Sequence, residues 1–270
     1  MKSSTFCKRT YPQGSDPWIR PLWISLVLAC GVVAAEPADP YARQRAALVG
    51  EIAADVRATR SYLDTEALDP AVLDAMGSVP RHRFVREGDI EHAYENRPLP
   101  IGHGQTISQP YIVASMTHAL QLPEWSRAHE GATPKVLDVG TGSGYQAAVL
   151  AEMGAEVVSI EREEELAELA RTRLDKLGYS VNVIVGDGSN GAPDEAPFAG
   201  IVVAAAAPEV PRPLVEQLVP DGRLIIPVGP RYEQSIILVR PSNSPPGFTQ
   251  QTIEPAVFVP LLGEHGFHER

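Results

Sequence analysis

Short apolar runs rich in β-branched residues alternate with amphipathic stretches over much of the chain. These runs are typical of buried strands, and they occupy residues 135–139, 156–160, 181–185, 200–203, 223–228 and 235–239. Helical stretches at 145–153 and 163–177 separate the first three runs, so we expect those strands to be parallel, joined by crossovers. The early runs hold too few polar residues to face water. The pattern predicts an α/β fold with a doubly wound, mostly parallel sheet, and we expect antiparallel strands at its C-terminal end.

Further helices are predicted ahead of the sheet. Leu48, Ile52 and Val56 recur at helical spacing, and Asp69-Pro70 offers an N-cap and a first-turn proline for a helix from 71 to 77. A third apolar stripe follows Ser108, at residues 112, 113, 116, 119 and 120. We therefore expect added N-terminal helices.

The first 35 residues resemble an export signal. Basic residues precede an uncharged apolar run at 21–35, which is too short for a comfortable permanent membrane span. Val33-Ala34-Ala35 offers the small residues that a signal peptidase accepts, and the segment around Cys30 resembles a lipoprotein box. We expect a signal peptide at 1–35, a linker at 36–43 and a single domain at 44–270, with a buried helix as the alternative for the apolar run.

Composition and charge exclude several functional classes. The 270 residues are 44% hydrophobic and 21% charged, as in globular proteins. The net charge is −11, and residues 1–35 contribute four basic groups against one acid, so the remainder carries −11 − 3 = −14. Such a body repels phosphate backbones, and we expect no nucleic-acid partner. Both cysteines, Cys7 and Cys30, lie in the predicted signal, and the histidines lack helical metal-site spacing, so we expect no metal.

A glycine-rich loop follows the run at 135–139. Gly140, Gly142 and Gly144, preceded by Asp138, lie between a predicted strand and a predicted helix. Glycines there let the backbone approach a ligand, and the helix N-terminus presents free N–H groups. A dinucleotide fingerprint needs its third glycine at the position of Tyr145, which disfavours NAD. We expect Asp138 and the three glycines to bind a small polar cofactor.

Two acidic residues close the next two predicted strands. Glu161 follows Gly140 by 21 residues, where a carboxylate can accept hydrogen bonds from ribose hydroxyls. Asp187, in Gly186-Asp187-Gly188, is placed to accept from an adenine amino group. Glu161 could instead begin a charged helix surface, and Gly-Asp-Gly is also an ordinary turn. Together the three strand ends favour a nucleoside cofactor.

The segment from Pro98 to Tyr111 resembles the hallmark P-I-G-x-G-Q-T-I-S-Q-P of the protein-L-isoaspartate O-methyltransferases. Further similar stretches lie at 79–85, 137–146, 186–188, 205–211 and 258–261, so the resemblance spans about residues 44–263. It implies a Rossmann-like class I methyltransferase with S-adenosyl-L-methionine as cofactor. The implied reaction esterifies the free α-carboxyl group of L-isoaspartyl residues in damaged proteins and peptides, which begins their repair to aspartyl residues. The implied partners are those proteins, and we expect a monomer.

The resemblance also implies residue roles. Ser108 is similar to the active-site serine, and Thr106, Ile107 and Ser108 are similar to a loop that closes over the cofactor. Gly140, Glu161, Asp187 and Gly188 match cofactor-binding positions. Two positions depart from the family pattern: Val257 stands where an arginine is frequent, and Ala204 where a threonine is frequent.

The implied chemistry asks little of the protein, because a carboxylate is already ionised at neutral pH and a sulfonium methyl group is already electrophilic. We expect Ser108 to orient the acceptor carboxylate, with no role as a nucleophile, since no His or Asp at suggestive spacing completes a triad. Capping of the helix that starts near Pro110 is an alternative or additional role.

Two other functions stay open at the level of sequence. One is a class I methyltransferase acting on a small molecule or RNA, and the other is a catalytically silent exported binding protein. S-adenosylmethionine is made in the cytosol, so an exported enzyme faces a supply problem, and a cytoplasmic location is the alternative to the periplasm or a lipid anchor at Cys30.

Overall fold

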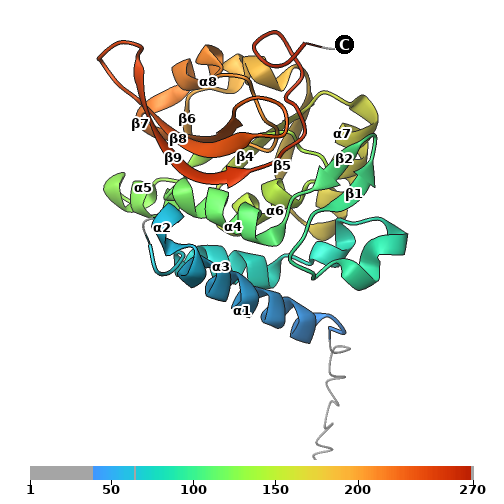
Figure 1. The fold of residues 1–270 in the computed structure, drawn as a ribbon. Helices are drawn as coiled ribbons and strands as arrows, with labels where there is room; N and C mark the ends of the chain where they lie inside the picture. The colour runs from blue at the N-terminus through green and yellow to red at the C-terminus, as the bar shows by residue number, and fades with distance from the viewer. Residues whose placement is uncertain (1–38, 64, 269–270) are drawn as a thin grey trace, which may run out of the picture. The chain divides into compact units, whose positions relative to one another are not determined.

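A seven-stranded sheet organises the part of the chain that the structure, a computed structural model, describes: residues 39–63 and 65–268 (Figure 1). The strand order is β5-β4-β3-β6-β7-β8-β9. The strands are β3 (Lys135–Val139), β4 (Glu156–Glu161), β5 (Val181–Val185), β6 (Phe198–Val203), β7 (Leu218–Val228), β8 (Gln234–Pro241) and β9 (Phe248–Ala256).

The pairing confirms the predicted fold class. Strands β3 to β7 pair in parallel, and β7, β8 and β9 pair antiparallel. The chain runs from β3 outward through β4 and β5, then returns to the other side of β3 with β6. This reversal places a topological switch point beside β3, where ligands bind in doubly wound sheets. In the register, Val139 pairs with both Ile160 and Val203, so the carboxyl ends of β3, β4 and β6 lie level.

Helices cover one face of the sheet, and a short helix with several loop segments covers the other. Strand residues at alternate positions, such as Val136 and Val157, pack with apolar residues of α4 (Pro110–Ala119), α5 (Leu122–Ala128) and α6 (Tyr145–Glu152). Strand residues whose side chains lie on the other face of the sheet, such as Leu137, pack with α8 (Arg212–Glu216) and with loop residues. The alternation explains why the strand sequences are apolar throughout.

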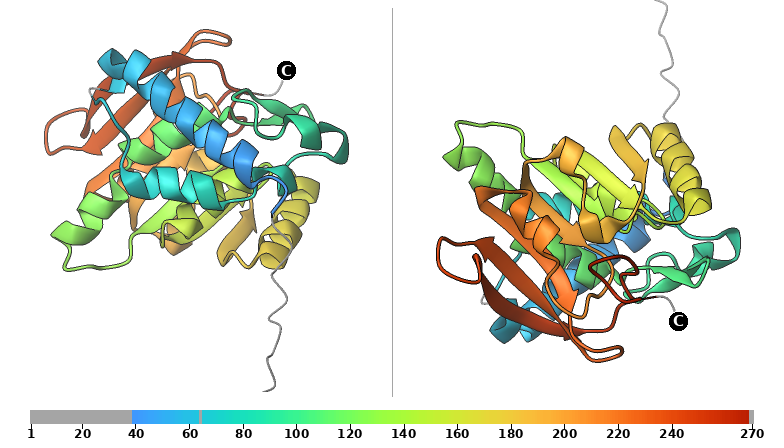
Figure 2. Two further views of the ribbon diagram at one scale, coloured as in Figure 1. Left: turned by 90° about the horizontal axis from the view of Figure 1, so that it is seen from below. Right: turned by 90° about the horizontal axis from the view of Figure 1, so that it is seen from above.

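An outer helical layer lies beyond α4 and α6, as Figures 1 and 2 show. It contains α1 (Ala42–Ala58) and α3 (Pro70–Ser78); the other helices are α2 (Arg60–Leu63) and α7 (Glu164–Leu177). The predicted stripe of α1 is buried, and the Asp69 carboxylate caps α3 by accepting from the Ala71 N–H at 2.9 Å. Helix α1 begins at Ala42, so it takes in the last two residues of the predicted 36–43 linker.

A two-stranded hairpin stands apart from the main sheet. Its strands, β1 (Leu99–Gly102) and β2 (Gln105–Ile107), pair antiparallel beside α7 (Figure 1). At the hairpin tip, His103 Nε2 lies 3.5 Å from the Glu165 carboxylate of α7. The hairpin therefore delivers the segment at 105–108 to the side of the sheet where β4 ends.

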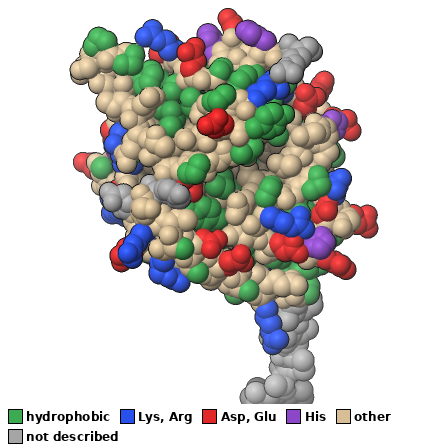
Figure 3. Space-filling model, viewed as in Figure 1, with side chains coloured by type: hydrophobic (Ala, Val, Ile, Leu, Met, Phe, Trp, Pro, Cys, Tyr) green, Lys and Arg blue, Asp and Glu red, His purple; other side chains and the backbone are tan. Residues whose placement is uncertain are grey.

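The predicted signal peptide at 1–35, with Cys7 and Cys30, lies outside the described residues. Within 39–63 and 65–268, no helix combines the length and the apolar character needed to cross a membrane. Figure 3 shows basic side chains scattered among acidic ones on one face, so this face presents no continuous positive surface to a nucleic acid.

Candidate active site

A cavity opens at the carboxyl ends of β3, β4 and β6. Residues from five stretches of the chain line it, together with Val113 and Gly188: 105–108, 139–146 except Gly144, 160–162, 204–205 and 259–262. The structure thus brings together Thr106, Ile107, Ser108, Gly140, Gly142, Glu161 and Gly188 of the predicted site. Asp138, Gly144 and Asp187 lie outside this lining.

The glycine loop adopts a backbone that side chains disfavour. Gly140, Gly142 and Gly144 have φ angles of 92°, 50° and 87°. The Gly140 N–H donates to the Ile160 carbonyl at 2.9 Å, which ties the loop to the end of β4. Gly144 occupies the N-cap position of α6 and so sets the start of that helix. The glycines are thus required by the turn itself as well as by the cavity.

Glu161 is oriented by backbone donors at the end of β4. Its side chain is buried, with 7% of the residue exposed. One carboxylate oxygen accepts from the Gly142 N–H at 2.8 Å, and the other accepts from the Glu163 N–H at 3.1 Å. An ionised carboxylate has about four acceptor positions, so this side chain keeps capacity for a ligand in the cavity.

Asp138 supports the glycine loop through hydrogen bonds in the protein interior. One of its carboxylate oxygens accepts from the Ser159 hydroxyl at 2.7 Å, and that hydroxyl also lies 2.6 Å from the Thr141 hydroxyl. Burial raises the pKa of Asp138 to about 7, the Ser159 hydrogen bond opposes the rise, and the Glu161 charge adds to it. The other carboxylate oxygen is buried without a partner among the described residues. Asp138 therefore reaches the cavity through Ser159 and Thr141.

Asp187 holds the C-terminal loop at the end of β5. Its carboxylate accepts from the Ser189 N–H at 2.9 Å, the Ser189 hydroxyl at 2.7 Å and the Glu264 N–H at 2.8 Å. Partial burial raises the pKa of Asp187, but these hydrogen bonds outweigh it and bring the pKa below its usual value. A Cβ on Gly263 would lie 2.0 Å from an Asp187 oxygen, so the contact requires glycine. Most of the acceptor capacity of this side chain is already used within the protein.

Ser108 follows β2 and is half-buried at the cavity wall. No hydrogen bond joins its hydroxyl to another side chain or backbone group in the described ranges, whereas its carbonyl accepts from Arg81 Nη2 at 2.8 Å. The interpretation of Ser108 as a helix cap is wrong: Gln109 occupies the N-cap position of α4, and the Tyr111 N–H donates to the Asn96 side chain at 2.9 Å. The hydroxyl is thus free to bind a ligand.

Sequence reasoning missed several residues of the site. Thr141, Tyr145 and Gln146 line the cavity, as does the segment 259–262. The segment was recognisable only as a family match, since nothing in its composition places it at the cavity, where it pairs with Ala206 after β6. Ala204 lines the cavity, and Val257 is 68% exposed and outside the lining. In the described part of the chain, no cluster of three or more His, Cys, Asp or Glu side chains forms a candidate metal site.

Comparisons with known proteins agree with one another. The family model described as protein-L-isoaspartate(D-aspartate) O-methyltransferase matches residues 61–266. A relative from Syntrophobacter fumaroxidans, protein-L-isoaspartate O-methyltransferase 2, is 50% identical over 242 residues, which is 89% of this chain and 94% of the relative. The protein-L-isoaspartate O-methyltransferase of Aeropyrum pernix is 48% identical over 86% of this chain and 84% of its own.

Two solved structures share the fold. A protein-L-isoaspartate O-methyltransferase aligns over 82% of this chain and 67% of its own, with a TM-score of 0.69 and 24% identity. A Plasmodium falciparum chain described as a beta-aspartate methyltransferase, in complex with S-adenosyl-L-homocysteine, aligns over 78% of this chain and 97% of its own. Its TM-score is 0.61 and its identity is 25%.

Proposed function

Because this chain belongs to the protein-L-isoaspartate(D-aspartate) O-methyltransferase family, we propose which of its residues carry out the family's reaction. The enzyme uses S-adenosyl-L-methionine to methylate the free α-carboxyl group of L-isoaspartyl residues in damaged proteins and peptides, which initiates their repair to aspartyl residues. We assign both the cofactor and the acceptor to the cavity at the ends of β3, β4 and β6.

The residues of the cavity fit the cofactor. The glycine loop has no side chain where Gly140 and Gly142 pass the cavity, so a ligand can approach its backbone. We assign the ribose hydroxyls to Glu161, because its carboxylate is fixed by two N–H groups and keeps free acceptor positions. Apolar side chains such as Ile160 and Leu261 line the same cavity and suit a flat base.

The remaining predicted residues take different parts in this proposal. Thr106, Ile107 and Ser108 cover the cofactor from the hairpin side. Gly188 permits close approach of the chain after β5 to β3, since a Cβ there would lie 2.6 Å from Val139 Cγ1. Asp138 and Asp187 act indirectly, the first by supporting the glycine loop and the second by holding the loop after Leu262.

When bound, the cofactor supplies an electrophilic methyl group, whose transfer to a carboxylate oxygen leaves S-adenosyl-L-homocysteine. The protein needs no general base, because the acceptor is already ionised at neutral pH. No histidine is among the residues that line the cavity. Ser108 donates its hydroxyl hydrogen to the acceptor carboxylate and so orients it, and oriented reactants can account for roughly 7–11 kcal/mol of barrier lowering.

One observation supports this assignment: Ser108, whose hydroxyl has no partner among the described residues, lines the same cavity as the glycine loop and Glu161. The test is transfer of labelled methyl from the cofactor to a peptide with one isoaspartyl residue. A methyl ester releases its label at alkaline pH, whereas N-methylated products keep it. Base-stable label, or label found only on RNA or a small molecule, would contradict the assignment.

The proposal extends to location and assembly. A signal peptide at 1–35 is supported by its basic residues, its apolar run and Val33-Ala34-Ala35. Sequencing of the native protein is expected to start near Glu36 or at a lipidated Cys30, and an intact Met1 in a cytosolic pool would favour the cytoplasmic alternative. We also propose that the protein is a monomer.

A further inference from the structure

Arg81 is a fully buried arginine next to the active-site serine. It belongs to the short 3₁₀ helix η1 (Arg81–Arg83), and 0% of the residue is exposed. Nη2 donates to the Ser108 carbonyl at 2.8 Å and reaches the Arg97 carbonyl at 3.5 Å. The guanidinium also lies over the Tyr145 ring, 4.8 Å from its centroid. Within 39–63 and 65–268 no carboxylate forms an ion pair with it, and Nε and Nη1 are buried without a hydrogen bond of good geometry; the Tyr145 side chain is the polar neighbour that acts most strongly on the guanidinium.

This arrangement is costly for stability alone. Burying a cation without a counter-ion carries a penalty that apolar residues of similar volume avoid. Burial lowers the pKa of Arg81 to about 10, which still leaves the side chain charged at neutral pH. A charge kept in such a place, beside the residues that bind ligands, indicates a role in the reaction.

The neighbours of Arg81 connect it to the cavity. Ser108 and Tyr145 both line the cavity, and the guanidinium contacts both. The peptide bond between Ser108 and Gln109 is trans, so its C=O and its N–H point in opposite directions. Because the Ser108 carbonyl faces Arg81, the Gln109 N–H faces away from Arg81. Fixing this peptide plane also restricts the positions open to the Ser108 side chain.

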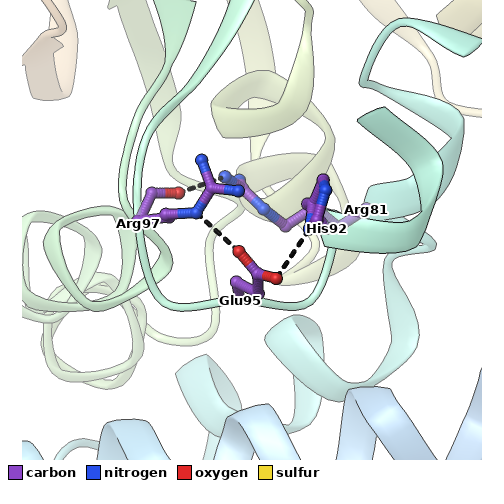
Figure 4. A network of polar contacts seen from close by, with 4 residues as sticks. All are labelled: Arg81, His92, Glu95 and Arg97. Atoms are coloured by element: carbon purple, nitrogen blue, oxygen red, sulfur yellow. Dashed lines mark hydrogen bonds and ion pairs between the residues drawn. The ribbon is translucent and has the colours of Figure 1, made fainter. Parts of the chain in front are cut away.

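A surface network fixes the loop that carries the Arg97 carbonyl, as Figure 4 shows. Glu95 accepts from Arg97 Nε at 2.5 Å and contacts His92 Nδ1 at 2.7 Å. These contacts fix the loop whose Arg97 carbonyl faces the buried guanidinium. Arg81 Nη2 thus donates to the Ser108 carbonyl and lies within reach of a carbonyl in this loop.

We propose that Arg81 is a positioning residue for the acceptor carboxylate: it fixes the Ser108–Gln109 peptide through the Ser108 carbonyl, and its unpaired charge favours an anion beside Ser108. This inference rests on the proposed role of Ser108. It explains why a cation without a counter-ion is buried at this position, since the acceptor brings the negative charge that the protein lacks there.

The test compares Arg81→Met and Arg81→Lys with the full chain, using an isoaspartyl peptide as acceptor. Loss of a hydrogen bond to a charged group predicts a fall of about tenfold or more in kcat/KM for Arg81→Met, mainly through a higher acceptor KM. Arg81→Lys keeps the charge and is expected to recover part of the loss. Affinity for S-adenosyl-L-homocysteine should stay within about twofold, and the Tm should not fall, because an unpaired buried charge has been removed.

The control is Arg223→Met. Arg223 is less buried than Arg81 but likewise donates to a backbone carbonyl, that of Ala119 at 3.2 Å, at the far end of α4 from Ser108. Its replacement should leave kcat/KM unchanged. If Arg81→Met does not fold, the same measurements are made on Arg81→Gln, which keeps a polar side chain at this position.

A double-mutant cycle separates positioning from general damage. In a Ser108→Ala background there is no hydroxyl to position and only the effect of the Arg81 charge on the acceptor remains, so Arg81→Met should cost less than in the wild type. Equal losses in both backgrounds, wild-type kinetics in Arg81→Met, or a parallel loss of S-adenosyl-L-homocysteine affinity would overturn the inference. In each of these cases the proposed function still stands if the wild-type protein methylates the isoaspartyl peptide. Failure of the Arg81 role can therefore be distinguished from failure of the proposed function.

Discussion

Replacement of Glu161 by alanine is the sharpest probe of the cofactor site. The carboxylate is buried at the cavity wall and accepts two backbone hydrogen bonds. If it also accepts from the ribose, removing it eliminates hydrogen bonds to a charged group, each worth about 1.5–3 kcal/mol. Affinity for S-adenosyl-L-homocysteine should therefore fall about 10- to 150-fold.

The same substitution has a structural cost that must be measured separately. It leaves the Gly142 N–H, which is only partly buried, without its acceptor; a fully buried unsatisfied donor costs about 1–3 kcal/mol, and this sets the upper limit of the loss. For a chain of this size, a loss of that order lowers the Tm by about 2–4 °C per kcal/mol. Titration calorimetry and thermal unfolding on the same sample separate binding from folding.

Glu163→Ala is the matched control for Glu161→Ala. The Glu163 side chain lies at the surface near Arg162, and only its backbone N–H takes part in the loop. Cofactor affinity should be unchanged in this variant. A folded Glu161→Ala protein with wild-type affinity would refute the assignment of the ribose to Glu161.

Three further predictions concern the surroundings of the cavity. Ser108→Ala should lower turnover, leave S-adenosyl-L-homocysteine affinity within a few-fold and leave the Tm unchanged, because its hydroxyl caps no helix; a large fall in Tm with full specific activity would contradict this. Gly188→Ala should destabilise the protein by about 1–3 kcal/mol in denaturant unfolding, since its Cβ would lie 2.6 Å from Val139 Cγ1, and wild-type stability would show that the chain shifts freely. Burial raises the pKa of Asp138 from 3.8 to about 7, so the folded protein holds this proton more tightly than the unfolded chain. Stability should therefore fall as pH rises from about 4 to 7, by on the order of 4 kcal/mol relative to Asp138→Asn, and parallel pH profiles for the two proteins would refute it.

The sequence predicted most of the sheet because its strands are buried on both faces. Continuous β-branched runs mark such strands, and all six predicted runs are strands in the structure. β9 was missed because residues 249–252 are exposed and polar, as suits an edge strand. The hairpin of β1 and β2 was missed because four- and three-residue strands carry too little pattern.

The site was predictable where a residue's position depends on its own strand. Glu161 lies where the end of β4 places it, and Gly140 and Gly142 lie in the turn after β3. Asp187 differs because one of its partners is the Glu264 N–H, 77 residues along the chain. The capping role of Ser108 was predicted wrongly for a similar reason: the acceptor for the Tyr111 N–H near the start of α4 comes from Asn96, a residue distant in the sequence. Arg81 lies in the similar stretch at 79–85, but its own chemistry gave no signal of burial, because charged residues are ordinarily exposed.

The central claim is that this cavity directs methyl transfer to an isoaspartyl carboxyl group. Its most direct test is the initial rate of methyl transfer to a peptide with one isoaspartyl residue, measured beside the same peptide with an ordinary aspartyl residue. The account predicts base-labile methylation of the isoaspartyl peptide and none above background for its twin. Equal rates for the two peptides, or no transfer to either by folded protein that binds S-adenosyl-L-homocysteine, would contradict it.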